Sequence, residues 1–107
     1  MICAKMLNRN GLLCGFDVQG HSGAAPSGSD IVCAAVSSAA LMAANTVTEI
    51  IGTSAKAEAE SGSMVFYLSE TNDKTEAILR GLELHLTELS KQYPHNIKVI
   101  YGGVKNA

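Results

Sequence analysis

Residues 29–52 of the chain read SDIVCAAVSSAALMAANTVTEIIG, and this stretch predicts one long helix. Ser29 or Asp30 can cap its start by accepting a backbone N–H bond, and Gly52 is a typical residue at a helix end. Many of the side chains are small, so we expect this helix to be central and packed on more than one side. Its apolar residues recur at helical spacing: Ile31, Val32, Ala35, Val36, Ala39, Ala40, Ala43, Val47, Ile50 and Ile51.

The residues before this helix, 1–19, predict a β-hairpin. Apolar and other residues alternate from Leu12 to Gln19 with a period of two, and Asn10-Gly11 is a pair that favours a tight turn. Cys14 falls on the more apolar face of the second strand, so we expect it to be buried, and we expect the same of Cys3 in the first strand.

The residues after the helix predict two strands and a second helix. Residues 53–62 are interpreted as a polar connection with solvated charges, and residues 64–68 and 97–101 as strands. The second helix begins near Asn72 or Asp73, and Pro94 lies just beyond its end. The order β-β-α-β-α-β indicates an α+β fold: one small two-layer domain over 1–107, with helices packed on a four-stranded sheet. The expected apolar stripe of the second helix is Ile78, Leu82, Leu86, Leu89 and Tyr93.

Composition excludes several classes of protein. The 107 residues include 8 Lys+Arg and 10 Asp+Glu, so the net charge is 8 − 10 = −2, and 47% of the residues are hydrophobic. This suits one globular domain and gives no basic patch for nucleic acid. No run approaches the roughly 18 apolar residues of a membrane span, so no membrane partner is expected. The start of the chain lacks the features of a signal peptide, which predicts a cytoplasmic protein.

The cysteines and histidines do not have the spacing of a metal site. Cys3, Cys14 and Cys33 are an odd number and contain no Cys-x-x-Cys pair, so neither a disulfide framework nor a zinc site is predicted. His85 and His95 are interpreted as surface residues. We therefore expect no metal and no cofactor.

Residues 20–30, GHSGAAPSGSD, form the one long break in periodicity, and they lie beside a cysteine. If Asp30 caps the helix, Cys33 is its third residue and lies near the positive end of the helix dipole, which favours a thiolate. His21 could then accept the thiol proton, as in cysteine–histidine catalysis. Spacing alone leaves the plainer alternatives open: a packed cysteine, an exposed histidine, and an Asp30 that only caps the helix.

The motif around these residues is more specific than its parts. Gly20-His21-Ser22-Gly23, followed by Gly28-Ser29-Asp30-Ile31-Val32-Cys33-Ala34-Ala35-Val36-Ser37, closely resembles the signature of the ribosomal-processing cysteine protease family. The resemblance implies a bacterial enzyme that removes a short N-terminal extension from large-ribosomal-subunit protein twenty-seven, cutting after a pair of aromatic residues. It also implies a homodimer.

The same resemblance implies a role for each residue of the motif. Cys33 matches the nucleophile and His21 the general base, with Asp30 and Ser37 in supporting roles. The substrate loop would include four residues: Gly20, Ser22, Gly23 and Gly28.

A mechanism and two rival functions follow from this assignment. We expect residues 22–29 to close over an extended peptide, and the Cys33 amide at the helix start to help bind the oxyanion. The first rival is a non-catalytic ribosome-associated binding module. The second is a redox or metal-binding thiol protein, whose metal ligands would be Cys33, His21 and Asp30.

Overall fold

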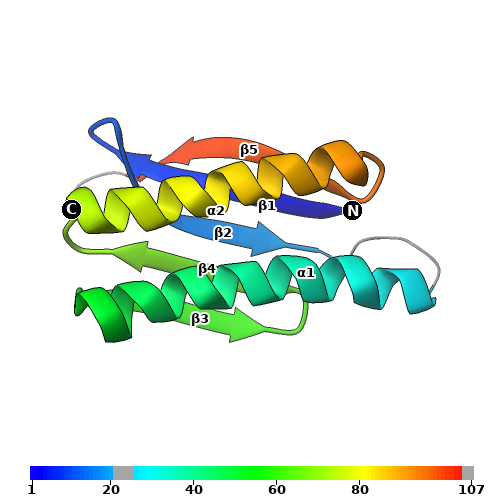
Figure 1. The fold of residues 1–107 in the computed structure, drawn as a ribbon, viewed down its shortest axis with the longest axis horizontal. Helices are drawn as coiled ribbons and strands as arrows, with labels where there is room; N and C mark the ends of the chain where they lie inside the picture. The colour runs from blue at the N-terminus through cyan, green and yellow to red at the C-terminus, as the bar shows by residue number, and fades with distance from the viewer. Residues whose placement is uncertain (21–25, 105–107) are drawn as a thin grey trace.

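The computed structural model describes residues 1–20 and 26–104, without the side chains of residues 26–30. Two strands come first, followed by a long helix with a short π-helical end, then a hairpin, a second helix and a last strand (Figure 1). The elements are β1 (Ile2–Arg9), β2 (Leu12–Gln19), α1 (Pro26–Asn45), η1 (Thr46–Ile51), β3 (Ala55–Glu60), β4 (Ser63–Leu68), α2 (Asp73–Gln92) and β5 (Ile97–Gly103).

The strands form one sheet in the order β3-β4-β2-β1-β5. Only the β1–β5 pair is parallel, and the other three pairs are antiparallel. Both helices lie on the same face of the sheet (Figure 1). The predicted two-layer α+β domain is therefore confirmed.

The prediction of four strands is wrong, because residues 55–60 form a fifth strand, β3, and not a polar connection. β3 is an edge strand that pairs with β4 alone, and all of its residues but Ala55 are exposed. Its sequence, Ala-Lys-Ala-Glu-Ala-Glu, has no large apolar side chain, so the pattern that reveals half-buried strands is missing. β3 extends the sheet beyond β4, on the side where α1 lies (Figure 1).

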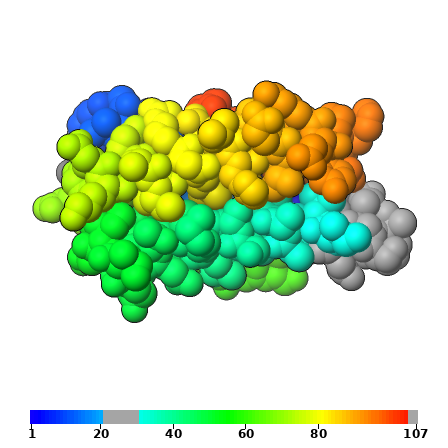
Figure 2. Space-filling view, in the orientation of Figure 1, coloured from blue at the N-terminus to red at the C-terminus, as the bar shows by residue number. Residues whose placement is uncertain are grey.

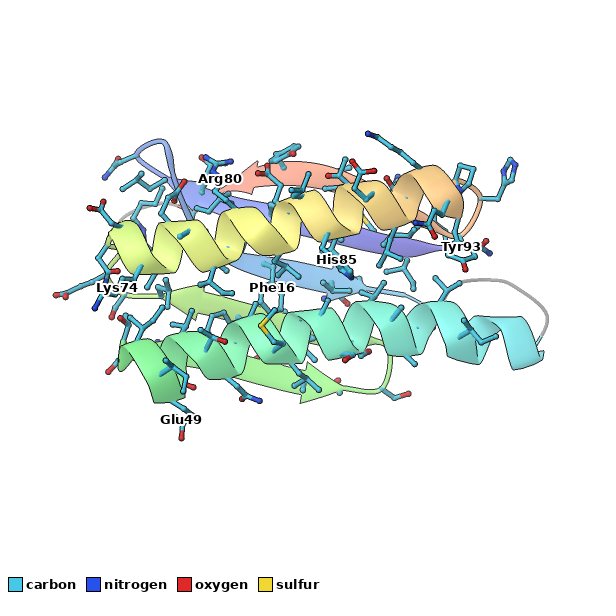
Figure 3. The ribbon with its side chains drawn as sticks, in the orientation of Figure 1. Phe16, Glu49, Lys74, Arg80, His85 and Tyr93 are labelled. Carbon is cyan, nitrogen blue, oxygen red and sulfur yellow. The ribbon has the colours of Figure 1, made fainter. Side chains whose placement is uncertain are left out.

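The core lies between the sheet and the two helices. Phe16 of β2 and Phe66 of β4 stack at its centre, with ring centroids 5.3 Å apart (Figure 3). α1 contributes small side chains, among them Val36 and Ala40, and α2 contributes Leu82. The α1 backbone approaches that of α2 more closely than that of any strand. One side of the helix is exposed, so α1 is not the central helix that the sequence predicts.

Helix α2 begins where the sequence predicts. Asn72 caps it by accepting hydrogen bonds from the Lys74 and Thr75 amides, and the Thr75 hydroxyl accepts one from the Asn72 amide in return. The predicted stripe is half correct. Leu82 and Leu86 are buried, Ile78 and Leu89 are half-buried, and Tyr93 is exposed, because the buried line runs through Thr75 and Leu79 instead.

A β-bulge changes the expected burial in β2. Leu7 pairs with Gly15 but Asn8 pairs with Leu13, so Cys14 is an extra residue in the ladder. Leu13 and Cys14 are both buried, whereas Leu12, which simple alternation places inside, is 42% exposed. Burial of Cys14 is confirmed, while Cys3 is only half-buried.

Several large apolar side chains of α1 and of the η1 turn that follows it are exposed. Ile31, Leu41, Met42 and Ile50 are between 48% and 80% exposed, and α1 and α2 together make up the face seen in Figure 2. The stretch Ile31–Ile51 has 21 residues with a mean hydropathy of 1.6, long and apolar enough to span a membrane by length and composition. The prediction that no stretch of the chain is long and apolar enough to span a membrane is therefore wrong. Val32, Val36 and Val47 nonetheless anchor the stretch in the core.

Candidate active site

A cavity of about 200 Å³ lies between α1 and one end of the sheet, and the Cys33 side chain lines it. The helix side of this cavity consists of Cys33, Val36 and Ser37, and the β3–β4 hairpin forms another side. The described residues of the lining are Ile2, Val18, Gly20, Cys33, Val36, Ser37, Ala59, Glu60, Gly62, Ser63 and Met64. We call it the Cys33 cavity.

Gly20 fixes where the chain leaves β2 at this cavity. Its φ is +96°, and a Cβ on it would lie 2.5 Å from the Met1 carbonyl oxygen, so only glycine fits. Its amide donates a 2.8 Å hydrogen bond to the Gly62 carbonyl in the β3–β4 turn. Gly20 therefore has a fixed position on the cavity wall. His21, Ser22 and Gly23 lie outside the described residues.

Helix α1 begins earlier than the sequence analysis predicts. Its first residue is Pro26, so Ser29 and Asp30 lie inside it and are not caps, and Cys33 is its eighth residue, not its third. Proline is favoured in the first turn of a helix because its missing N–H needs no partner there. The predicted caps, Ser29 and Asp30, therefore lie about one turn after the observed start of the helix.

This early start changes the chemistry expected at Cys33. The helix dipole acts mainly within the first turn, and Cys33 is seven positions after Pro26, which is about 10 Å along the axis. The Cys33 amide also lies beyond the first four residues, whose N–H groups are free. Both predictions, thiolate stabilisation by the helix start and an oxyanion role for the Cys33 amide, assume that Cys33 is the third helical residue, and that placement is wrong.

The structure brings some of the predicted site residues together. Cys33, Ser37 and Gly20 line the same cavity, with Ser37 one turn after the half-buried Cys33. Gly28 lies in the first turn of α1 and not in a loop, which contradicts the expectation that all of residues 22–29 form a connection. The side chain of Asp30 is outside the described residues.

Sequence reasoning missed the hairpin side of the site. Glu60, Gly62 and Ser63 line the cavity, but the sequence analysis assigned Glu60 to a polar connection. They reach the site because Ser63 of β4 pairs both with Glu60 of β3 and with Gln19, the last residue of β2. No local pattern in the sequence indicates such a pairing.

The other cysteines and histidines differ from Cys33 in their surroundings. Burial raises the pKa of the Cys14 thiol, although the charge of Arg9 acts in the opposite direction. His85 and His95 are exposed, as predicted. Among the described residues no three His, Cys, Asp or Glu side chains gather as metal ligands. The set Cys33, His21 and Asp30 includes side chains outside that range, so the metal alternative remains untested.

Cys33 thus presents a half-buried thiol beside a cavity, on a helix that follows the Gly20-His21 pair in the sequence. Residues 1–98 match the family described as Cysteine protease Prp, so the chain belongs to this family of cysteine proteases. None of the proteins with curated descriptions matches it.

Solved structures share the fold over nearly the whole chain. The ribosomal processing protease Prp from S. aureus, in complex with a covalently linked product peptide, is 23% identical with a TM-score of 0.85, covering 95% of this chain and 100% of that one. The same enzyme with a substrate peptide gives 23% and 0.84, with the same coverage. The protein SMU.848 from Streptococcus mutans is 24% identical with a TM-score of 0.79, covering 97% and 96%.

Proposed function

We propose that this protein is a cysteine endopeptidase that removes a short N-terminal extension from a ribosomal large-subunit protein, with Cys33 as nucleophile and His21 as general base. One observation carries the proposal: Cys33 lines a cavity whose wall also includes Gly20, the residue directly before His21 in the sequence. The S. aureus protease with the same fold is a ribosomal processing enzyme that holds peptides, one of them covalently.

In the proposed reaction the acyl group of the substrate passes first to Cys33 and then to water. His21 accepts the Cys33 proton, and the thiolate attacks the scissile carbonyl to give a tetrahedral oxyanion. Collapse breaks the C–N bond, and the imidazolium protonates the leaving amine, which leaves a thioester on Cys33. Water, deprotonated by His21, then attacks the thioester. Collapse breaks the C–S bond and releases the carboxyl product, and the imidazolium returns its proton to the Cys33 thiolate.

The remaining residues of the motif support this chemistry. Ser37 lies one turn from Cys33 on the same wall and is placed to bind substrate or water. Asp30 precedes Cys33 by three residues on α1, which puts both on neighbouring positions of one helix face. The Cys33 amide belongs to the helix interior, so the oxyanion donors are other groups than this amide.

We also infer that the enzyme is a cytoplasmic homodimer. The exposed apolar side chains of α1 support the dimer, because soluble monomers rarely expose large contiguous apolar surfaces. A groove of about 560 Å³ between α1 and α2 lies in the same face and is floored by small residues, including Ala35, Ser38 and Gly81. Sedimentation of the purified protein tests the oligomeric state.

The proposal predicts one specific cut in the extended ribosomal protein. We expect the purified enzyme to convert that protein to a product with a single new N-terminus, within minutes, when the masses are followed by mass spectrometry. A binding module would leave the mass unchanged while still associating with the protein. If no new N-terminus forms, the proposed substrate is wrong. If the enzyme then cleaves only unrelated peptides, it is a protease with a different specificity.

A further inference from the structure

A second cavity, of about 330 Å³, lies at the end of the sheet where β3 begins and β4 ends (Figure 1). Arg9 is one of its lining residues, and we call it the Arg9 cavity. It shares no described lining residue with the Cys33 cavity, which lies at the turn of the same hairpin. Met64 of the Cys33 cavity and Tyr67 of the Arg9 cavity are three residues apart on β4, about 10 Å. The two cavities are therefore separate.

The Arg9 guanidinium is held in place at this cavity. Its Nη1 atom donates hydrogen bonds to the Leu68 carbonyl at 3.1 Å and to the Ser69 carbonyl at 3.3 Å, and both of these residues line the cavity. Its Nε atom is buried and donates to no described group. Burial without a partner is found at Nε alone, so the Nη2 donors, which have no described partner, remain accessible. Arg9 is thus an oriented cation whose hydrogen bonding is incomplete.

Lys56 brings a second positive charge to the same cavity. It pairs with Tyr67 across the β3–β4 ladder, while the next residue of β4, Phe66, is in the core. Because side chains alternate along a strand, Lys56 and Tyr67 both lie on the sheet face opposite the helices. Ser54 and Ser69 complete the polar lining, so three hydroxyl groups accompany the two cations.

No carboxylate of the described chain neutralises either cation. The ion pairs that the described residues form all lie within α2. Glu58 follows Lys56 by two residues on the same face of β3, and Glu70 follows Ser69, but neither glutamate lines the cavity. The described lining therefore carries two positive charges and no negative charge.

From this arrangement we propose that the Arg9 cavity binds the phosphate group of a small organic phosphate. A phosphate ester carries a charge of about −1.5 to −2 at pH 7, which matches two cations, whereas a carboxylate carries a single charge. Hydroxyl groups, such as those of Ser54, Tyr67 and Ser69, can donate to the remaining oxygens. The inference does not depend on the proposed function.

The fixed position of Arg9 favours such a ligand. A guanidinium that two carbonyls already hold loses little freedom when an anion binds to it. Its buried Nε has exchanged water for no described partner, and a nearby anion offsets part of that loss. The cavity volume is also at the lower end of the range for small-molecule pockets, about 300 to 1,000 Å³.

The test is a titration of the ¹⁵N-labelled protein with inorganic phosphate, with phenyl phosphate and with acetate, followed by NMR. Chloride keeps the ionic strength constant. We expect saturable shifts of the amide signals of residues 54–56 and 67–69 and of the Arg9 Nε–H signal, with both phosphates. Acetate should bind at least about fivefold more weakly, because it carries half the charge.

Two variants test which residues hold the phosphate. Lys56→Gln should raise the Kd of phenyl phosphate at least about fivefold, since one charge-assisted hydrogen bond is lost. Arg9→Gln should raise it further, but it also removes the two carbonyl contacts. If Arg9→Gln does not fold, the exposed Lys56 decides the result.

Lys98→Gln is the matched control for charge. Lys98 is exposed and pairs with Cys3 on the same face of the sheet, but it does not line the cavity. Its variant should change the Kd by less than about twofold, as expected for a distant surface charge. An unchanged Kd in Lys56→Gln, equal binding of acetate, binding of inorganic phosphate alone, or shifts that do not saturate would each overturn the inference.

Discussion

Replacing Cys33 by serine or alanine is expected to lower the rate of peptide cleavage by at least about a thousandfold. An alcohol is a far weaker nucleophile than a thiolate in a site built around a cysteine, and alanine offers no nucleophile at all. Cys33 is half-buried at the edge of the core, so the change removes little packing. The fold should survive, with a nearly unchanged midpoint of thermal unfolding.

Cys3→Ser is the matched control for this substitution. Cys3 is also half-buried, but it lies on β1 and does not line the cavity. Its variant should retain the wild-type rate. Full turnover by Cys33→Ala, with product identified by mass, would remove Cys33 as the nucleophile.

Replacing His21 by alanine is expected to reduce kcat/KM by about a hundredfold to ten-thousandfold, the usual contribution of a general base. The measurement is the profile of kcat/KM against pH for the wild type and the variant.

His95→Ala provides the control, since His95 is exposed in the turn between α2 and β5 and lies far from Cys33 in the sequence. It should leave the profile unaltered. If His21→Ala keeps both the rate and the pH dependence of the wild type, another group accepts the proton.

The sequence predicts those parts of the fold that depend on local residue patterns. Periodicity predicts α1, α2 and the first hairpin, and Asn72 predicts the start of α2. It does not predict β3, whose residues carry no apolar alternation because an edge strand buries little. Nor does it predict the bulge at Cys14, which depends on how β1 and β2 pair and not on either strand alone.

The candidate site divides in the same way. Cys33 and Ser37 lie one turn apart on a helix, so the sequence places them together and the structure confirms that both line one cavity. Glu60 joins them only through pairing across three strands, which no spacing in the sequence reveals. The position of Cys33 within α1 was mispredicted, because a helix that starts at Pro26 has several polar residues before its first apolar one.

Alkylation of the three cysteines with iodoacetamide at neutral pH, followed by peptide mapping and by residual activity, tests the central claim most directly. The reagent reacts with thiolates. Cys14 is buried and its pKa is raised, so little thiolate forms there and reaction should be slow. We predict that Cys33 is modified first and that activity falls in step with its modification. Equal labelling of Cys3, Cys14 and Cys33, or full activity after complete modification of Cys33, would contradict the account.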